Sequence, residues 1–313
     1  MKNRVGRIII GILALLFLGF YTYRQEQIHW HSDDVASWGP ATGLHPEGFQ
    51  ADTVITAPQE TPVQMSYSTE APELPAVEPT EEPAPAEPEL SPTLQLAMDN
   101  AAALGLPVPP DVDVESWEMM LANPWHPIET YQPPQMGYLN MTLSETDIQT
   151  NYNPNRCAVD LRIAEQLFAF AQGCKDAGLP VYLSSGYRSY DEQSYLFQRK
   201  IGQGYAEDVA ATIVARPGTS EHQTGLACDI TDYYRETKDS SLEQTPTYQW
   251  LRDNCADYGF VVRYPADKSG SADSVTGIIY EPWHFRYVGV EAAHYMTDNN
   301  LCLEEFLALY GVE

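Results

Sequence analysis

The chain has 313 residues, enough for one or two domains, and carries 44 acidic against 17 basic side chains, for a net charge of -27. No lysine or arginine occurs between Gln25 and Asn155. A chain this acidic, without a basic patch, is a poor binder of nucleic acids, so we expect no nucleic-acid partner.

The first 24 residues have the pattern of a membrane-targeting segment. Lys2, Arg4 and Arg7 precede an uncharged apolar run over 8–20, which suits the apolar part of a signal sequence. No small-x-small cleavage site follows this run. We therefore expect an uncleaved signal anchor over 1–24, in a single-pass protein of the cell membrane whose remaining chain lies outside the cytoplasm. A cleaved signal peptide is the alternative.

Residues 25–112 have the composition of a disordered spacer. Proline, glutamate, alanine and threonine alternate over 57–92, with almost no aromatic or β-branched periodicity. Such a stretch cannot bury enough apolar surface to offset its loss of chain entropy on folding, and its prolines and like charges keep it extended. A short helix is expected over 94–104, before the prolines of 107–110.

The globular domain is expected over 113–313. Apolar residues recur at helical spacing over 156–177, and Gly178 is suited to end that helix. Ser189 and Glu192 have the spacing of a capping box for a helix that reaches about residue 200. Further strands are expected over 181–185, 226–231, 260–264, 277–280 and 283–288, and further helices over 206–215, over 247–258 and twice at the C-terminus. Because the elements show no regular β-α-β alternation, we expect an α+β fold with a small, mostly antiparallel sheet and flanking helices.

Two short segments contain candidate metal ligands. The first, over 220–229, contains His222 and Asp229, and the second, over 281–284, contains Glu281 and His284. Two histidines, one aspartate and a spare glutamate form the set that a catalytic zinc site uses: three ligands, an open position for water, and a carboxylate that takes the proton of that water. The five cysteines form no Cys-x-x-Cys pair, which argues against a structural zinc site.

The local sequence explains how each segment can direct its side chains to one point. A turn at Gly225 would place His222 before a strand and Asp229 within it, with Cys228 on the opposite, core-facing side. In the second segment Pro282 interrupts regular strand pairing, which lets the preceding glutamate approach the same site.

The motifs together resemble the zinc D-alanyl-D-alanine carboxypeptidases of the VanY type, which are grouped with the lysostaphin- and hedgehog-like zinc peptidases. The pattern is Ser-x-His-x-x-Gly-x-Ala-x-Asp over 220–229 and Glu-x-Trp-His over 281–284, with Ser-Gly-Tyr-Arg-Ser upstream at 185–189. The resemblance covers about residues 115–313, and it leaves the expected anchor and spacer outside.

The resemblance implies a role for each of the metal-site residues. His222, Asp229 and His284 would bind one zinc ion per catalytic domain. Glu281 would be the general base that activates the zinc-bound water and then returns the proton to the leaving amine.

The resemblance also implies three residues that meet the substrate. Arg188 would hold the developing oxyanion of the scissile carbonyl, or the substrate itself, through its fixed fork of donors. Gln193 and Ser220 would contact the terminal region of the peptide.

The expected function is therefore a membrane-anchored zinc carboxypeptidase that removes the terminal D-alanine from peptidoglycan stem peptides outside the cell. Two alternatives stay open: an L,D-carboxypeptidase that acts on tetrapeptide stems, and a non-catalytic zinc-fold module that binds the cell wall. The presence of Glu281 favours an enzyme, because a binding module needs no base.

Overall fold

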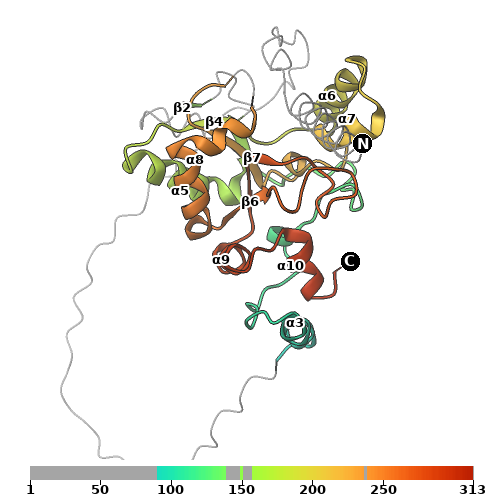
Figure 1. Ribbon diagram of the computed structural model, residues 1–313, viewed down its shortest axis with the longest axis vertical. Helices are drawn as coiled ribbons and strands as arrows, with labels where there is room; N and C mark the ends of the chain where they lie inside the picture. Colours follow the sequence, from blue (N-terminus) through green and yellow to red (C-terminus); the bar gives the residue numbers. More distant parts are fainter. Residues whose placement is uncertain (1–89, 139–148, 151–156, 236–237, 313) are drawn as a thin grey trace, which may run out of the picture. The chain divides into compact units, whose positions relative to one another are not determined.

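The computed structural model describes residues 90–138, 149–150, 157–235 and 238–312 (Figure 1). The expected anchor over 1–24 and most of the expected spacer lie outside these residues. Within the described part, the longest helices have 13 residues, whereas a bilayer-spanning helix needs about 20. No described helix is long and apolar enough to cross a membrane. This finding overturns the expected single-pass membrane location.

The sheet is mostly antiparallel, as predicted. Its strands are, in spatial order, β2 (Gln149–Thr150), β4 (Tyr182–Ser185), β5 (Ala227–Thr231), β7 (Glu281–Tyr287) and β6 (Phe260–Tyr264). Within this sheet β2 and β4 run parallel, and the other neighbouring pairs run antiparallel. A separate antiparallel pair joins β1 (Met136–Tyr138) to β3 (Ala158–Asp160). The strands β5 and β7, which contain both candidate metal segments, are therefore neighbours near the centre of the sheet.

Helices surround this sheet and give the described residues an α+β fold (Figure 1). The α-helices are α3 (Pro92–Ala103), α5 (Ala164–Asp176), α6 (Tyr190–Gly202), α7 (Glu207–Ile213), α8 (Pro246–Asn254), α9 (Val290–Asp298) and α10 (Leu303–Leu309). Short 3₁₀ helices are η1 (Trp117–Met119), η3 (Leu161–Ile163), η4 (Glu221–Thr224), η5 (Ser240–Gln244) and η6 (Cys255–Tyr258). The capping box predicted from Ser189 and Glu192 is present at the start of α6, and Gly178 follows α5 with a φ of +78°.

One predicted strand is wrong. Residues 277–280 form no strand, because the Ile279 N–H donates to the carbonyl oxygen of Thr212 in the last turn of α7 instead of to a neighbouring strand. The strand β7 begins only at Glu281 and continues through Pro282.

The main core lies between α5, α8 and one face of the sheet. The Phe170 ring of α5 meets Phe260 and Phe285 at centroid distances of 5.4 and 5.5 Å. Cys228 of β5 lies in the same apolar cluster, as its alternation with Asp229 predicts. All five cysteines are buried and none forms a disulfide. The core therefore fixes one face of β5 and β7, and the opposite face is available for polar groups.

A second apolar cluster joins α3 to α9 and α10. Ala97 and Ala101 of α3 are buried in it together with Phe306 and Leu309 of the C-terminal helix. The side-chain amide of Asn100 also donates to the carbonyl oxygen of Leu309 at 2.8 Å. The helix predicted over 94–104 thus exists, but it belongs to the packed unit, whereas the sequence analysis placed the start of the domain at residue 113.

Candidate active site

A tight turn brings His222 back over Asp229. His222 lies in η4, and Gly225 ends this short helix with a φ of +74° before β5 begins. A Cβ atom at Gly225 would lie 2.7 Å from Cγ of Pro133 and 2.9 Å from the backbone nitrogen of Asp160. Both the left-handed conformation and the close packing therefore require glycine here. As a result, Nε2 of His222 lies 3.4 Å from Oδ1 of Asp229.

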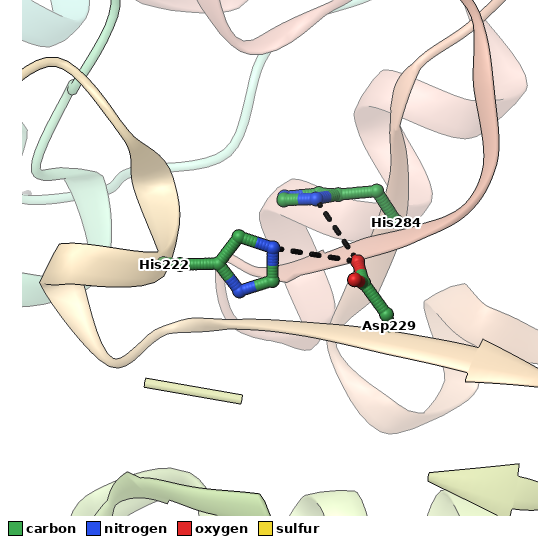
Figure 2. A group of neighbouring side chains, drawn as sticks. All are labelled: His222, Asp229 and His284. Carbon is green, nitrogen blue, oxygen red and sulfur yellow. Dashed lines mark ion pairs between the residues drawn. The ribbon is translucent and has the colours of Figure 1, made fainter. Parts of the chain in front are cut away.

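Strand pairing brings the second histidine to the same aspartate. His284 of β7 is directly opposite Asp229 of β5 in the antiparallel ladder, so both side chains project from the same face of the sheet. Nδ1 of His284 lies 3.3 Å from Oδ1 of Asp229. The rings of His222 and His284 are 4.8 Å apart and nearly perpendicular, at 76°. Figure 2 shows the three side chains converging on one point.

The hydrogen bonds leave at least one ligand atom free on each of the three residues. Nδ1 of His222 is engaged with the carbonyl oxygen of Gly186 at 2.6 Å, so its Nε2 faces the site. The ammonium of Lys238 binds Oδ2 of Asp229, whereas Oδ1 of Asp229 and Nδ1 of His284 are buried without a hydrogen-bond partner. Buried polar atoms are normally satisfied. A metal ion would satisfy these.

The two distances from Asp229 to the histidine nitrogens fit a tetrahedral zinc ion. Metal–ligand bonds of about 2.0–2.1 Å place neighbouring ligand atoms of a tetrahedron roughly 3.3 Å apart, close to the 3.3 and 3.4 Å observed around Asp229. With two imidazole nitrogens and one carboxylate oxygen, the donor set also matches catalytic zinc sites, which keep a fourth position open.

The electrostatics of the group favour the protonation states that bind metal at two of the three residues. Burial and the nearby charge of Arg188 lower the pKa of His222 to about 4, so its imidazole is neutral. Burial alone would raise the pKa of Asp229, but the charge of Lys238 holds it well below its usual range. Burial would lower the pKa of His284, but its contact with Asp229 raises it to about 9. A metal must therefore displace a proton from His284.

The strand β7 departs from regular pairing just before His284. Val262 of β6 is opposite Phe285, but Tyr264 is opposite Glu281, so β7 contains two extra residues between these pairs. This irregularity lies at Pro282, which cannot donate a backbone hydrogen bond to the ladder. The predicted break in the ladder is thus a bulge within a continuous strand.

The bulge places Glu281 beside His222, Asp229 and His284, which we call the metal-ligand group. Oε2 of Glu281 lies 3.5 Å from Nδ1 of His284. Burial raises the pKa of Glu281 to about 7. A carboxylate with a pKa near neutrality is suited to accept a proton and release it again at the operating pH.

Hydrogen bonds to His222 and Gln193 hold Arg188 near the site. Its backbone N–H donates to the carbonyl oxygen of His222 at 3.1 Å. The side chain of Gln193 is fully buried. Its Oε1 accepts from Nη1 of Arg188 at 2.8 Å, and its amide nitrogen donates to the carbonyl oxygen of Ala215 at 2.6 Å. Ser220 is buried at the start of η4, two residues before His222.

Sequence reasoning missed two charged residues at the site, Glu221 and Lys238. Glu221 is fully buried and its Oε2 lies 3.5 Å from Nε2 of His284. Lys238 partners Asp229 and also lies 5.7 Å from the centre of the Trp283 ring. The position of Glu221 beside His222, within the motif, is the signal that could have pointed to it. Nothing in the local sequence around Lys238 indicates its contact.

A buried His-Asp-His group beside a carboxylate, on an α+β sheet, defines a metallopeptidase. The family model for VanY, D-alanyl-D-alanine carboxypeptidase, matches residues 156–290. A D-alanyl-D-alanine carboxypeptidase of Enterococcus faecalis is 34% identical over 204 residues, which cover 62% of this chain and 67% of that protein. The putative carboxypeptidase YodJ of Bacillus subtilis is 36% identical over 178 residues, which cover 56% of this chain and 61% of that protein.

A solved structure shows the same relationship in three dimensions. The LdcB LD-carboxypeptidase is 32% identical, with a TM-score of 0.53, and the match covers 61% of this chain and 86% of that one. The chain therefore belongs to the VanY family of D-alanyl-D-alanine carboxypeptidases.

Proposed function

We propose that the protein is a zinc-dependent D,D-carboxypeptidase that removes the terminal D-alanine from peptidoglycan stem peptides. The observation that carries this proposal is the convergence of three buried ligand atoms, from His222, Asp229 and His284, within 4.8 Å of one another and beside Glu281. Membership of the VanY family supports the substrate class.

In this mechanism each residue has a defined task. Nε2 of His222, Oδ1 of Asp229 and Nδ1 of His284 would hold one zinc ion. A zinc ion at this position would supply Lewis-acid polarisation of the scissile carbonyl and a water whose pKa is about 7. Lys238 pairs with Oδ2 of Asp229 and so keeps Oδ1 of Asp229 directed at the site. Glu281 takes the proton of the attacking water on its carboxylate and returns it to the leaving D-alanine amine.

Arg188 binds the substrate in the proposed reaction. Its guanidinium offers donors in a rigid fork, which suits a carbonyl oxygen that becomes negatively charged, or the terminal carboxylate. Gln193 orients this guanidinium through the hydrogen bond to Nη1. Ser220 precedes η4, the short helix that contains His222. In the proposed reaction it contacts the end of the peptide.

We further propose that the catalytic domain begins near Leu90 instead of residue 113, because α3 packs on the C-terminal helices. The preceding spacer remains a prediction from composition.

A second candidate is an L,D-carboxypeptidase, and one observation favours it. The solved structure that matches with a TM-score of 0.53 is named an LD-carboxypeptidase. Such an enzyme would cleave before the single D-alanine of a tetrapeptide stem. The named relative from Enterococcus faecalis favours D,D-specificity instead.

The test is hydrolysis of synthetic stem peptides by purified protein, with released D-alanine as the readout. A D,D-carboxypeptidase releases one D-alanine from the pentapeptide and leaves the tetrapeptide intact, and an L,D-carboxypeptidase does the reverse. Removing metal with a chelator should abolish release, and one equivalent of zinc should restore it. Full activity in metal-free protein, or no hydrolysis of either stem by zinc-loaded protein, would contradict the proposal.

A further inference from the structure

A network of four charged side chains is buried directly behind the metal-ligand group. Oε1 of Glu221 accepts from Nε of Arg263 at 2.6 Å and from Nη1 of Arg286 at 2.8 Å. Glu304 of α10 accepts from the two remaining nitrogens of Arg263 at 2.9 and 2.6 Å. The side chains of Glu221, Arg263 and Arg286 are 0% exposed. The network therefore lies in the interior, where water cannot solvate its charges.

Stability alone is a poor explanation for this network. Removing charges from water is costly, and replacing a buried ion-pair network with well-packed apolar residues is often neutral or even stabilising. Buried charges are better explained where they fix the position of a functional group. Here the functional group next to the network is the metal-ligand group, which Glu221 approaches at His284.

One oxygen of Glu221 is left over and faces His284. Both Oε2 of Glu221 and Nε2 of His284 are buried without a hydrogen-bond partner, and they lie 3.5 Å apart. On the other side of the imidazole, Nδ1 of His284 faces Oδ1 of Asp229 at 3.3 Å. The Tyr264 ring packs against the imidazole at a centroid distance of 4.8 Å. The ring is therefore located between the ligand group and a carboxylate.

We propose that Glu221 is the positioning residue of His284: its Oε2 accepts the Nε2 proton and so leaves Nδ1 free to bind the metal. This inference rests on the proposed zinc site. Metal-bound histidines commonly donate their other ring N–H to a carboxylate, which fixes the ring and its tautomer. Arg263 and Arg286 hold the carboxylate by its other oxygen and thereby aim Oε2 at the ring.

The chain connectivity adds a second consequence. Glu221 and His222 are adjacent in η4, so one short helix carries a metal ligand and also the partner of the other histidine ligand. Any shift of η4 would move both contacts together. The buried arginines of β6 and β7 prevent such a shift, because they bind Glu221 to the sheet that carries His284.

The substitution Glu221→Gln tests this role sharply. Both arginines would claim the single amide oxygen of glutamine, so its NH₂ group would face Nε2 of His284 and favour the tautomer with a proton on Nδ1. In that tautomer Nδ1 carries a proton, so it has no lone pair with which to bind the metal. Glu304→Gln is the matched control, because it also removes one buried carboxylate from Arg263 but has no contact with His284 among the described residues.

The first measurement is the zinc dissociation constant, determined by competition with a chromophoric chelator. Loss of an outer carboxylate partner typically weakens metal binding about 10–100-fold, and we expect this for Glu221→Gln. Glu304→Gln should stay within about twofold of the wild type, and urea unfolding of the zinc-free proteins checks that both variants fold. Equal zinc affinity in the wild type and Glu221→Gln would overturn the inference. Absence of zinc binding in the wild type would overturn the proposed function as well.

A second measurement needs no variant and decides the matter if Glu221→Gln does not fold. Imidazole ¹H–¹⁵N spectra of the zinc-loaded wild-type protein should show His284 with a proton on Nε2 that exchanges slowly, and none on Nδ1. A His284 ring that carries its proton on Nδ1, or an Nε2 proton that exchanges as fast as in an exposed histidine, would overturn the assignment while the zinc site itself stands.

Discussion

Gln193 and Arg188 form a partly buried hydrogen bond of 2.8 Å between Oε1 and Nη1. The other end of the Gln193 amide donates to the carbonyl oxygen of Ala215. Both ends of this fully buried side chain are thus engaged with the protein. The sequence predicts that Gln193 contacts the peptide, whereas this geometry favours a role through Arg188.

Replacing Gln193 with leucine should reduce catalysis by releasing Arg188. A hydrogen bond to a charged group contributes about 1.5–3 kcal/mol, so kcat/KM on the preferred stem peptide should fall roughly 10–100-fold with zinc content unchanged. Gln172→Leu is the control, because Gln172 forms an exposed hydrogen bond on α5. In an Arg188→Ala background, Gln193→Leu should have little further effect. Two fully additive losses would show that Gln193 meets the peptide directly.

Glu281→Gln should separate catalysis from metal binding. Glutamine preserves the shape of the side chain but cannot accept a proton, and general acid–base groups typically contribute about 10²–10⁴-fold. We expect kcat to fall by at least that range, with one zinc still bound per chain by elemental analysis. A variant that lost its zinc would identify Glu281 as a ligand, and a variant that kept both zinc and activity would place the base elsewhere.

The same substitution should change how stability depends on pH in the zinc-free protein. Burial raises the pKa of Glu281 from 4.5 to about 7. Between these pH values the folded state keeps a proton that the unfolded state releases, so the free energy of unfolding falls as pH rises. The loss is complete above pH 7 and amounts to about 3 kcal/mol.

Glutamine cannot ionise, so Glu281→Gln should gain stability relative to the wild type at pH 8 and show little gain at pH 4. Urea unfolding of both zinc-free proteins at the two pH values measures this difference. The other titrating groups, including His284, are present in both proteins, so the comparison isolates Glu281. An equal offset at both pH values would show that the pKa of Glu281 is not raised.

Local signals in the sequence predicted those parts of the site that depend on neighbouring residues. The Gly225 turn, the alternation that separates Asp229 from Cys228, and the departure of β7 from regular pairing at Pro282 were all expected, because each follows from backbone geometry. The membrane location and the strand at 277–280 were not borne out. In the latter stretch the backbone hydrogen bonds go to another part of the chain.

The missed features depend on residues far apart in the sequence. Glu221 meets Arg263 and Arg286, which are 42 and 65 positions away, and no spacing rule relates them. The buried state of Gln193 was also hidden, because a polar residue on a helix is usually exposed. The packing of α3 on α10 also joins segments that are far apart in the sequence. The proline-rich stretch before α3 gave no sign of this contact.

Gly225→Ala should damage both the fold and the metal site. The residue has a φ of +74°, and a Cβ atom would lie 2.7 Å from Pro133 and 2.9 Å from the backbone of Asp160. Gly178→Ala is a matched control, since Gly178 has a φ of +78° with nothing within 4 Å of the added carbon. We expect Gly178→Ala to cost about 1 kcal/mol and Gly225→Ala to cost more, by about 1–3 kcal/mol.

Zinc affinity distinguishes the two glycines further. Displacing the Gly225 turn moves His222 relative to Asp229, so Gly225→Ala should bind zinc at least 10-fold more weakly, whereas Gly178→Ala should bind it as the wild type does. Urea unfolding and chelator competition give both quantities. Equal effects of the two substitutions would mean that the close packing of Gly225 does not position the ligand turn.

The last prediction concerns where the folded unit begins. Removal of residues 1–89 should leave the free energy of unfolding and kcat/KM unchanged. Removal of residues 1–112 should destabilise the protein by about 3–5 kcal/mol. The larger truncation exposes the face of α10 that α3 covers, and it removes the hydrogen bond from Asn100 to Leu309. Two point variants of the full chain check the cause. Leu94 is 7% exposed, so Leu94→Ala should cost about 2–3 kcal/mol of stability. Leu96 on the same helix is 43% exposed, so Leu96→Ala should cost less than about 0.5 kcal/mol. If residues 113–313 alone unfold with the same free energy as residues 90–313, α3 is an accessory to the domain and the boundary expected from the sequence at residue 113 is restored.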